Sequence, residues 1–363
     1  MKTYVTSFKR KSVQKVKTLQ DFKDLLKKQE VELVPQYSVQ TFENKTPYHA
    51  PSWVDRNHIR SIMDRLEKDL RMLNRTYPNA SKQEHFTTFQ IPKASGGMRT
   101  INAPSEELKA EHNNIRRRIK ETLKVLAHDK AFAYVNNRSI KDALIRHQMN
   151  ESNWFLKVDI SGFFNACTED TISYQLNRVY PFYEHPEMTK ELAKFAVLNN
   201  ELPQGTPLSP DLTNWIMVPF DHTFDTWCKS KGFMYTRYAD DILISHKDSF
   251  DFKEVVQKIE QLFSSQLYPF KIKEEKTRYG SRKGQNWNLG LMLNANNDIT
   301  LGHEFKKRMK VLLYQTAEGV IPNKDPHVIG LFNYLKQIEP AYYSYLNSYA
   351  ISKYRLDIKG IIQ

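Results

Sequence analysis

The sequence predicts an α+β fold in which an antiparallel sheet carries packed helices and is followed by a helical C-terminal part. Short apolar runs rich in β-branched residues flank turn residues at 86–101 and 233–245, which is typical of β-hairpins. Longer segments with apolar residues at helical spacing, such as 56–73 and 252–266, alternate with these strands. From residue 301 onward only helical spacing remains, which predicts a separate helical part.

The amino-acid composition limits the kinds of function that this chain can have. The chain has 363 residues, 40% of them hydrophobic, enough for one large domain or two to three interlocked subdomains. Its formal net charge of +13 favours a polyanionic partner, most simply a nucleic acid. No apolar run approaches the roughly 20 residues of a spanning helix, and no signal peptide is visible, so we expect a cytoplasmic protein without a membrane partner. Cys167 and Cys228 are far apart and lack metal-ligand spacing, which predicts two reduced thiols rather than a disulfide or zinc site.

Residues 1–85 read as a basic N-terminal extension with helices at 19–28 and 56–73. Its lysines and arginines fit either a solvated face or an arm that contacts phosphates. A hairpin follows, with strands at 86–91 and 98–101 around Gly96 and Gly97. Lys93 and Arg99 flank this flexible tip, where two cations suit a triphosphate, although a basic surface hairpin is the alternative.

Two further segments are strongly basic. A helix is expected from Ser105, and its charged faces include Arg116, Arg117 and Lys120; so much positive charge favours contact with a template or duplex. A second basic helix is expected at 304–316, where Lys306 and Lys307 are candidate nucleic-acid contacts.

Three carboxylates are the candidate catalytic groups. Asp159 ends a buried-type strand at 154–160, where an aspartate is rare without a partner. Asp240 and Asp241 lie at the turn between predicted strands 233–238 and 242–245. Adjacent like charges repel, so an ordered pair of this kind usually binds a cation.

The loop at 201–210 contains two prolines and a glycine before a predicted helix at 211–226. Gln204 supplies donors and acceptors, and Gly205 allows close approach of a backbone. Beyond the catalytic hairpin we expect a helix at 252–266, strands at 269–272 and 287–293, and a turn at 294–297. Asp325 and Pro326 predict the start of a helix that Pro340 ends.

Several of these motifs resemble bacterial reverse transcriptases of the retron or stand-alone antiphage-defence kind. The resemblance rests on Tyr238-Ala239-Asp240-Asp241, on Ile91-Pro92-Lys93 with the following glycine pair and Arg99, on Leu202-Pro203-Gln204-Gly205, and on Asp159 with its downstream phenylalanines. It covers about residues 86–340 and implies a right-hand polymerase fold. Residues 86–158 would then be the fingers, 159–300 the palm and 301–363 a helical thumb.

The resemblance also implies roles for single residues. Asp159, Asp240 and Asp241, together with Ile160, would bind two Mg²⁺ ions, with Mn²⁺ as an alternative. Phe164 would be the steric gate that selects dNTPs, and Gln204 with Gly205 would line the nucleotide pocket beside Lys93 and Arg99. Lys276 would be the proton donor near the pyrophosphate.

The function implied is an RNA-directed DNA polymerase that copies a dedicated noncoding RNA into DNA, in a retron-like or antiphage-defence system. Its partners would be the RNA template, the DNA product, dNTPs, a noncoding RNA and an effector protein; the oligomeric state stays open. Segments 142–147 and 288–290 depart from the usual retron pattern. One alternative is a template-independent or protein-primed DNA polymerase, for which the tyrosines at 342–354 are candidate primers. A catalytically silent RNA-binding module is the other, but such a module has no reason to keep three repelling carboxylates.

Overall fold

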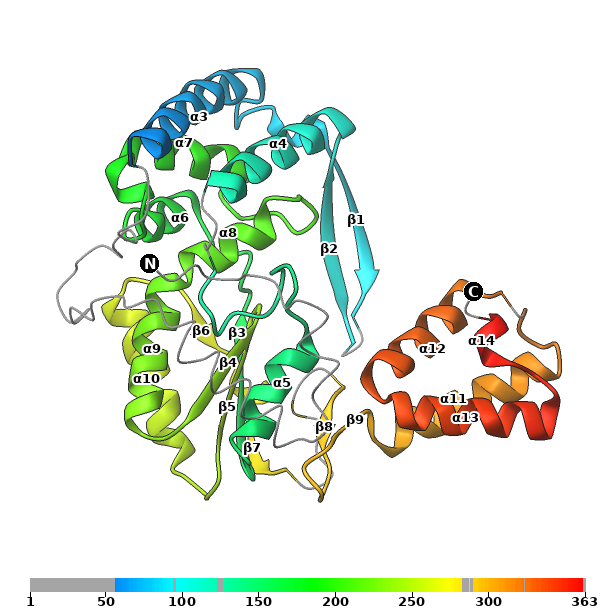
Figure 1. Cartoon of the computed structure of the whole chain (residues 1–363). Helices are drawn as coiled ribbons and strands as arrows, with labels where there is room; N and C mark the ends of the chain where they lie inside the picture. Colours follow the sequence, from blue (N-terminus) through cyan, green and yellow to red (C-terminus); the bar gives the residue numbers. More distant parts are fainter. Residues whose placement is uncertain are drawn as a thin grey trace. The chain divides into compact units, whose positions relative to one another are not determined.

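The computed structural model describes residues 56–93, 96–122, 127–282, 287, 290–322 and 324–361. The helix expected at 19–28 and the remaining basic extension before residue 56 lie outside them. The chain divides into two compact units, which can be followed in Figure 1. Unit 1 comprises Met1–Lys124 and Cys167–Pro219, and unit 2 comprises Val125–Ala166 and Phe220–Gln363.

Unit 1 combines a helical core with a two-stranded ribbon. Its helices are α3 (Arg56–Thr76), α4 (Glu106–Thr122), α6 (Glu169–Leu176), α7 (Pro186–Ala196) and α8 (Ser209–Ile216), with short 3₁₀ turns at Lys82–His85 and Phe182–Glu184. The predicted helix at 56–73 is confirmed, because the apolar residues of α3 are buried at helical spacing and α3 packs on α7. Strands β1 (Phe86–Pro92) and β2 (Met98–Pro104) form the predicted hairpin, in register from Phe86↔Pro104 to Pro92↔Met98.

Unit 2 is built around an antiparallel sheet of order β4-β5-β3-β6, with β7 also paired to β3. The strands are β3 (Trp154–Ser161), β4 (Met234–Tyr238), β5 (Asp241–His246), β6 (Lys271–Ile272) and β7 (Arg278–Ser281). The predicted hairpin over 233–245 is therefore confirmed, although its turn is shorter than expected because Asp241 already belongs to β5.

Helices lie on both faces of this sheet. They are α5 (Ile140–Met149), α9 (Val218–Ser230) and α10 (Phe252–Ser265) (Figure 1). Successive side chains of a strand point to opposite faces. On β4, Tyr235 bonds to Asp221 of α9, whereas the next residue, Thr236, contacts His147 of α5. Alternation from the paired strands therefore places Asp159 and Asp241 on the α5 face.

The C-terminal part is helical, as predicted: α11 (Gly302–Ala317), α12 (Pro326–Ile338), α13 (Pro340–Tyr354) and the short α14 (Ile358–Ile361). Asp325 caps α12 by accepting hydrogen bonds from the backbone N–H groups of His327 and Val328, which confirms the predicted start. A continuous core joins apolar residues of α11, α12 and α13 to Trp287 and to Phe155 of β3. Two strands, β8 (Met292–Leu293) and β9 (Ile299–Thr300), form a small hairpin before α11.

Three predicted elements differ from the structure. The helix expected at 211–226 is two helices, α8 and α9, separated at Met217. Pro219 explains the break, since proline in a continuous helix would clash with the carbonyl four residues earlier. Of the strand expected at 287–293, the described residues form strand β8 at Met292–Leu293, and Gly290, with φ +102°, leaves the extended conformation before it. The strand expected at 269–272 is confined to Lys271–Ile272.

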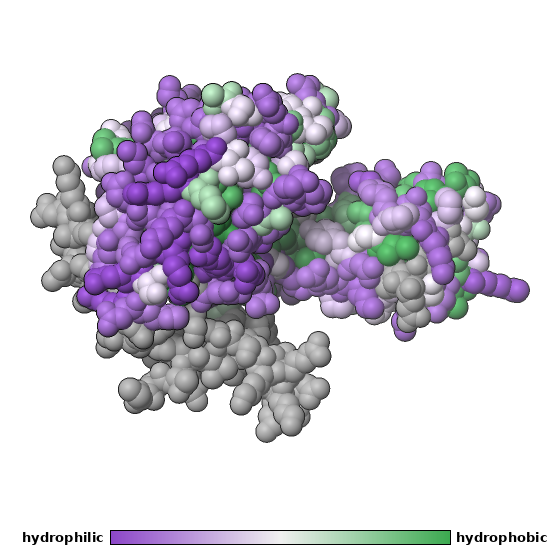
Figure 2. All heavy atoms as spheres, turned by 90° about the horizontal axis from the view of Figure 1, so that it is seen from above, coloured by the Kyte–Doolittle hydropathy of each residue, from purple (hydrophilic) through white to green (hydrophobic). Residues whose placement is uncertain are grey.

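None of the described helices combines the length and the apolar character that a membrane crossing requires. Figure 2 shows that hydrophilic residues cover most of one face, in keeping with the net charge of +13. Hydrophobic residues are also exposed on the C-terminal helices and the turn after α11, among them Val311, Val320 and Ile351.

Candidate active site

The three predicted carboxylates come together at one end of the sheet in unit 2. Asp159 on β3 is directly opposite Asp241 on β5 in the strand register. Asp240 occupies the turn between β4 and β5, and its carbonyl oxygen accepts a hydrogen bond of 3.1 Å from the backbone N–H of Ile160. Residues more than 80 positions apart in sequence thus form one acidic cluster, as the sequence predicted.

Mutual repulsion and partial burial perturb this cluster. Burial, with the negative charges of Asp241 and Asp159, raises the pKa of Asp240 to about 6. Burial also raises the pKa of Asp241, despite the opposing effect of Lys157. A carboxylate pair held at such electrostatic cost is typical of a functional site rather than of a structural one.

Two lysines partly neutralise the cluster. Lys157 Nζ lies 2.9 Å from Asp241 Oδ2, and Lys276 Nζ lies 2.9 Å from Asp159 Oδ2. The hydrogen bond to Asp159 raises the pKa of Lys276, so this lysine is protonated at neutral pH. Lys276 was predicted from the sequence, whereas Lys157 was not. Its signal was available: a lysine two positions before Asp159 in an apolar strand must lie on the same face.

The donor set fits a hard divalent cation. Three carboxylates supply the oxygen ligands that Mg²⁺ and Mn²⁺ prefer. Asp241 Oδ1 is buried and has no hydrogen-bond partner among the described residues, which leaves one oxygen ready for a cation. Ile160, also predicted as a ligand, has a buried apolar side chain, so it can offer only its carbonyl oxygen.

The two phenylalanines after Asp159 differ in environment. Phe163 is buried and packs on Phe270, with ring centroids 5.1 Å apart. Phe164 is half-buried and contacts the edge of Phe163, so of the two it is the one with a partly accessible ring. Its role as a steric gate stays a prediction.

The predicted nucleotide-pocket residues Lys93, Arg99, Gln204 and Gly205 all belong to unit 1, whereas the carboxylates belong to unit 2. Their shared pocket therefore stays a prediction. Within unit 1, the Gln204 carbonyl oxygen accepts a 2.8 Å hydrogen bond from the N–H of Asn102 on β2. Lys93 and Arg99 are exposed on the ribbon.

Gly205 shows why this loop needs glycine. Its φ is +132°, and a Cβ atom there would lie 2.5 Å from the backbone oxygen of Asn102. We expect Gly205→Ala to displace the Gln204 loop from β2 and to destabilise unit 1 by about 1–3 kcal/mol, measured by urea unfolding. Gly97→Ala is the matched control, because Gly97 also has positive φ (+79°) but open space around it. Equal losses for the two variants would show that backbone strain alone, rather than the Asn102 contact, is responsible.

Four of the five basic residues predicted to bind nucleic acid form ion pairs within the chain. Arg116 and Lys120 both form ion pairs with the buried Asp211 of α8. Arg117 faces Glu121, and Lys306 lies 2.6 Å from Glu339. The charge of α4 is thus balanced internally and does not by itself require a nucleic acid. Lys307 is exposed.

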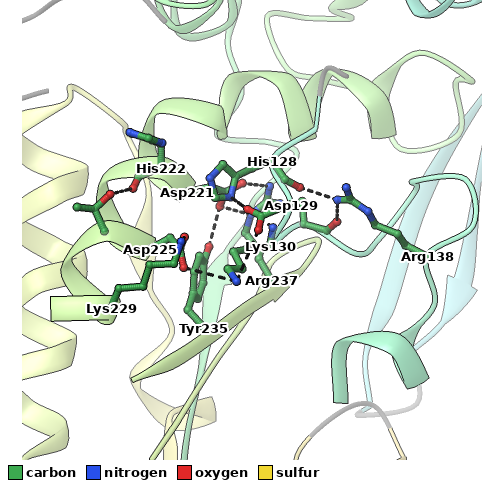
Figure 3. A network of polar contacts seen from close by, with 12 residues as sticks. His128, Asp129, Lys130, Arg138, Asp221, His222, Asp225, Lys229, Tyr235 and Arg237 are labelled. Carbon is green, nitrogen blue, oxygen red and sulfur yellow. Dashed lines mark hydrogen bonds and ion pairs between the residues drawn. The ribbon is translucent and has the colours of Figure 1, made fainter. Parts of the chain in front are cut away.

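Another polar cluster surrounds α9 in unit 2 (Figure 3). His128, Asp129 and Asp225 have candidate ligand atoms within 4.8 Å of one another. Lys130 lies 3.6 Å from Asp129 and 3.9 Å from Asp225, and Lys229 lies 2.7 Å from Asp225. These lysines already neutralise the carboxylates, so we assign no metal to this cluster.

Comparison with known proteins decides the family. Residues 91–309 match the family described as Reverse transcriptase (RNA-dependent DNA polymerase). This chain is a member of the reverse transcriptase family. The matched region contains the three carboxylates, the Gln204 loop and Lys276.

Individual relatives agree with this assignment. The reverse transcriptase is 30% identical over 272 residues to the Retron Ec83 reverse transcriptase of Escherichia coli, covering 71% of this chain and 84% of the relative. It is 28% identical over 284 residues to the Retron Ec73 reverse transcriptase of Escherichia coli, covering 75% and 88%. Among solved structures it matches an apo telomerase from Candida tropicalis truncated from its C-terminal domain, with a TM-score of 0.46, 13% identity, and 59% and 54% of the two chains covered.

Family membership confirms the predicted fold class and enzyme class. The reverse transcriptase has an α+β, right-hand polymerase fold, and it is an RNA-directed DNA polymerase whose substrates are an RNA template and dNTPs. Enzymes of this family use divalent metal ions, in agreement with the fit of the carboxylate cluster.

Proposed function

We propose that this reverse transcriptase copies a dedicated noncoding RNA into DNA, in a retron-like antiphage-defence system with an effector protein as a further partner. The observation that carries the catalytic part is the cluster of Asp159, Asp240 and Asp241, in which the buried Asp241 Oδ1 has no hydrogen-bond partner among the residues that the structure describes. Support for the biological part comes from the relatives, whose names identify them as retron reverse transcriptases.

In this proposal Asp159, Asp240 and Asp241 would hold two Mg²⁺ ions. When bound, the ions would lower the pKa of the primer 3′-OH and stabilise charge on the α-phosphate and pyrophosphate. Lys276 has a complementary task. Its ammonium group donates a hydrogen bond to Asp159, and this protonated lysine would supply a proton to the leaving pyrophosphate.

Other residues would bind and select the nucleotide. Lys93 and Arg99 would neutralise the triphosphate, since cations stabilise the charge that develops during phosphoryl transfer. Phe164 would exclude the ribose 2′-OH, and Gln204 with Gly205 would line the pocket. Residues 86–158, 159–300 and 301–363 would act as fingers, palm and thumb.

The helical C-terminal part offers a surface suited to nucleic acid. Lys306 lies over the ring of Tyr342, Lys310 over Tyr345 and Tyr349, and Lys353 over Tyr349 and Tyr354. Alternating cations and aromatic rings can contact phosphates and stack on unpaired bases. Tyr345 is 53% exposed, so its ring is available for such stacking.

Sequencing of all nucleic acid that copurifies with the wild type and with Asp240→Asn tests the proposal. We expect one discrete RNA in both samples, because Asp240→Asn changes a residue of the proposed metal site and none of the basic residues proposed to contact RNA. DNA complementary to that RNA is expected only with the wild type. The DNA ends would then identify the priming group.

Two outcomes would contradict the proposal. DNA unrelated to any bound RNA would favour untemplated synthesis, and a heterogeneous RNA population without an enriched species would argue against a dedicated template. Complementary DNA in the Asp240→Asn sample would instead refute the catalytic assignment.

A further inference from the structure

We propose that the buried Asp221–Arg237 ion pair is a positioning device for the reverse-transcription reaction, which fixes the turn that presents Asp240 to the metal ions. Neither residue was singled out as functional by its sequence pattern. The inference rests on the metal-binding role proposed above for Asp240, and every contact on which it depends lies within unit 2.

Arg237 and Asp221 form a buried ion pair with two parallel hydrogen bonds. Arg237 and Asp221 have fully buried side chains, and the guanidinium binds the carboxylate through two nitrogens, Nε to Oδ1 at 2.8 Å and Nη2 to Oδ2 at 2.6 Å. The Tyr235 hydroxyl donates a third hydrogen bond to Asp221 Oδ1, at 2.7 Å. Figure 3 shows the side chains of Tyr235 and Arg237, both from β4, pointing toward Asp221 of α9. The guanidinium is therefore held in a fixed plane.

The fixed guanidinium of Arg237 also contacts the turn between β4 and β5. Its remaining nitrogen, Nη1, donates a 3.1 Å hydrogen bond to the carbonyl oxygen of Ala239. That carbonyl belongs to the peptide that enters Asp240. The carbonyl on the other side, that of Asp240 itself, accepts from the N–H of Ile160. Asp240 is thus held from both sides, by Arg237 before it and by the strand of Asp159 after it.

The turn at Ala239 requires stabilisation by neighbouring groups, because its backbone conformation is strained. Ala239 has φ +57°, in the left-handed region that favours glycine in tight hairpin turns. A side chain in this region is strained, so without outside support the turn would relax to another conformation. Relaxation would move Asp240, whose carboxylate must stay beside Asp159 and Asp241.

The backbone of Arg237 is fixed as well. Its N–H donates to the Lys130 carbonyl at 2.7 Å, and its carbonyl accepts from the N–H of Phe132 at 2.9 Å. Arg138 in turn donates to the carbonyl oxygens of His128 and Ala131, which holds this neighbouring segment in place (Figure 3). The arginine is therefore anchored at both its backbone and its side chain, and the Ala239 carbonyl is bound from a rigid support.

A purely structural pair would hold α9 to the sheet without affecting the metal site, so the test must separate stability from metal binding. The variant Asp221→Leu/Arg237→Met in a Tyr235→Phe background removes both charges without stranding either one. Tyr235→Phe alone is the matched control, because it removes a bond to Asp221 but leaves the link from Arg237 to Ala239. Arg237→Lys is a second variant that keeps the charge pair but lacks the planar fork needed to reach both Asp221 and Ala239.

The first readout is Mn²⁺ binding, titrated by electron paramagnetic resonance without nucleic acid or dNTP, with unfolding by urea measured in parallel. We expect the triple variant and Arg237→Lys to bind Mn²⁺ about tenfold more weakly than the Tyr235→Phe control while remaining folded. The second readout is steady-state synthesis, where kcat is expected to fall by about ten- to a hundredfold, as for a misplaced catalytic group. KM for primer–template is expected to stay unchanged.

Asp240→Asn calibrates the experiment. If it leaves Mn²⁺ binding and synthesis intact, the proposed metal site itself is wrong. If it weakens both, but folded Arg237→Lys and the triple variant bind Mn²⁺ like the control, the positioning role is refuted while the metal site stands. If the triple variant fails to fold, Mn²⁺ binding by Arg237→Lys relative to the Tyr235→Phe control tests the positioning role.

Discussion

Asp240→Asn is expected to abolish DNA synthesis and, in the metal-free protein at neutral pH, to stabilise the fold. The loss of activity should reach at least about a thousandfold, because a preorganised electrostatic group is removed from the reacting centre. The gain in stability follows from the same charge. Burial and two neighbouring aspartates raise the pKa of Asp240 from 3.8 to about 6, so the folded chain disfavours its ionised form.

The sign of the pH dependence follows from this shift. A carboxyl group with a raised pKa binds its proton more tightly in the folded state, so its favourable contribution is complete below pH 3.8 and is lost as the pH rises through about 6. Above that range the ionised group destabilises the metal-free fold by about 1–3 kcal/mol. We therefore expect the stability advantage of Asp240→Asn to be small at pH 4, to grow through pH 6 and to be constant above pH 7.

Urea unfolding in the presence of a chelator measures this difference. Asp248→Asn is the matched control, because Asp248 is an exposed aspartate just beyond the same hairpin. With Mg²⁺ present, the wild type should become more stable than Asp240→Asn, since only the wild type gains stability by binding the ion. A metal-free variant less stable than the wild type at pH 8 would contradict the expectation.

Asp221→Leu is expected to produce the largest loss of stability. It leaves the guanidinium of Arg237 without its counter-charge at a fully buried position. Breaking a buried ion pair by removing one partner typically costs about 3–5 kcal/mol, whereas removing both charges is often nearly neutral. We therefore expect Asp221→Leu/Arg237→Met to recover much of the stability lost by the single variant.

The control is an exposed pair of similar length, Lys231 and Glu254, which are 2.7 Å apart and nearly half exposed. Glu254→Gln should change the free energy of unfolding by less than about 1 kcal/mol. Urea unfolding followed by tryptophan fluorescence compares the variants. A single variant within 1 kcal/mol of the wild type would show that the Arg237 charge is solvated by other means. A double variant as unstable as the single would show that the unpaired charge is not the cause of the loss.

The local sequence pattern was sufficient to predict those elements whose structure depends only on residues close together in the chain. The helical spacing of α3, the glycine-containing β1–β2 hairpin and the cap at Asp325 were predictable, because each depends on residues within one element. The acidic cluster was predictable for a different reason. Carboxylates at the ends of apolar strands are so unfavourable that they indicate a shared ligand even before the strands are paired.

What sequence could not reveal was which distant residues neutralise one another. Asp211 binds Arg116 and Lys120, which precede it by more than 90 positions, and so provides a counter-charge for a helix that looks strongly basic in the sequence. Asp221 likewise lies within the helix predicted at 211–226, and nothing in that segment identifies Arg237 as its partner. Periodicity shows which face of an element is apolar, but it does not show which element will cover that face.

The division of the chain also bears on how this enzyme can change in evolution. The polypeptide leaves unit 2 after Ala166, soon after Asp159, and returns to it at Phe220, just before Asp221. The Gln204 loop therefore belongs to an excursion between two segments of the unit that carries the carboxylates. Neither unit is encoded by one uninterrupted stretch of the gene, so no single truncation, fusion or recombination crossover can exchange one while leaving the other whole. Variation should thus accumulate by point substitution and by loop insertion within each unit, and a split version of the enzyme would require fragments that reassemble around a shared fold.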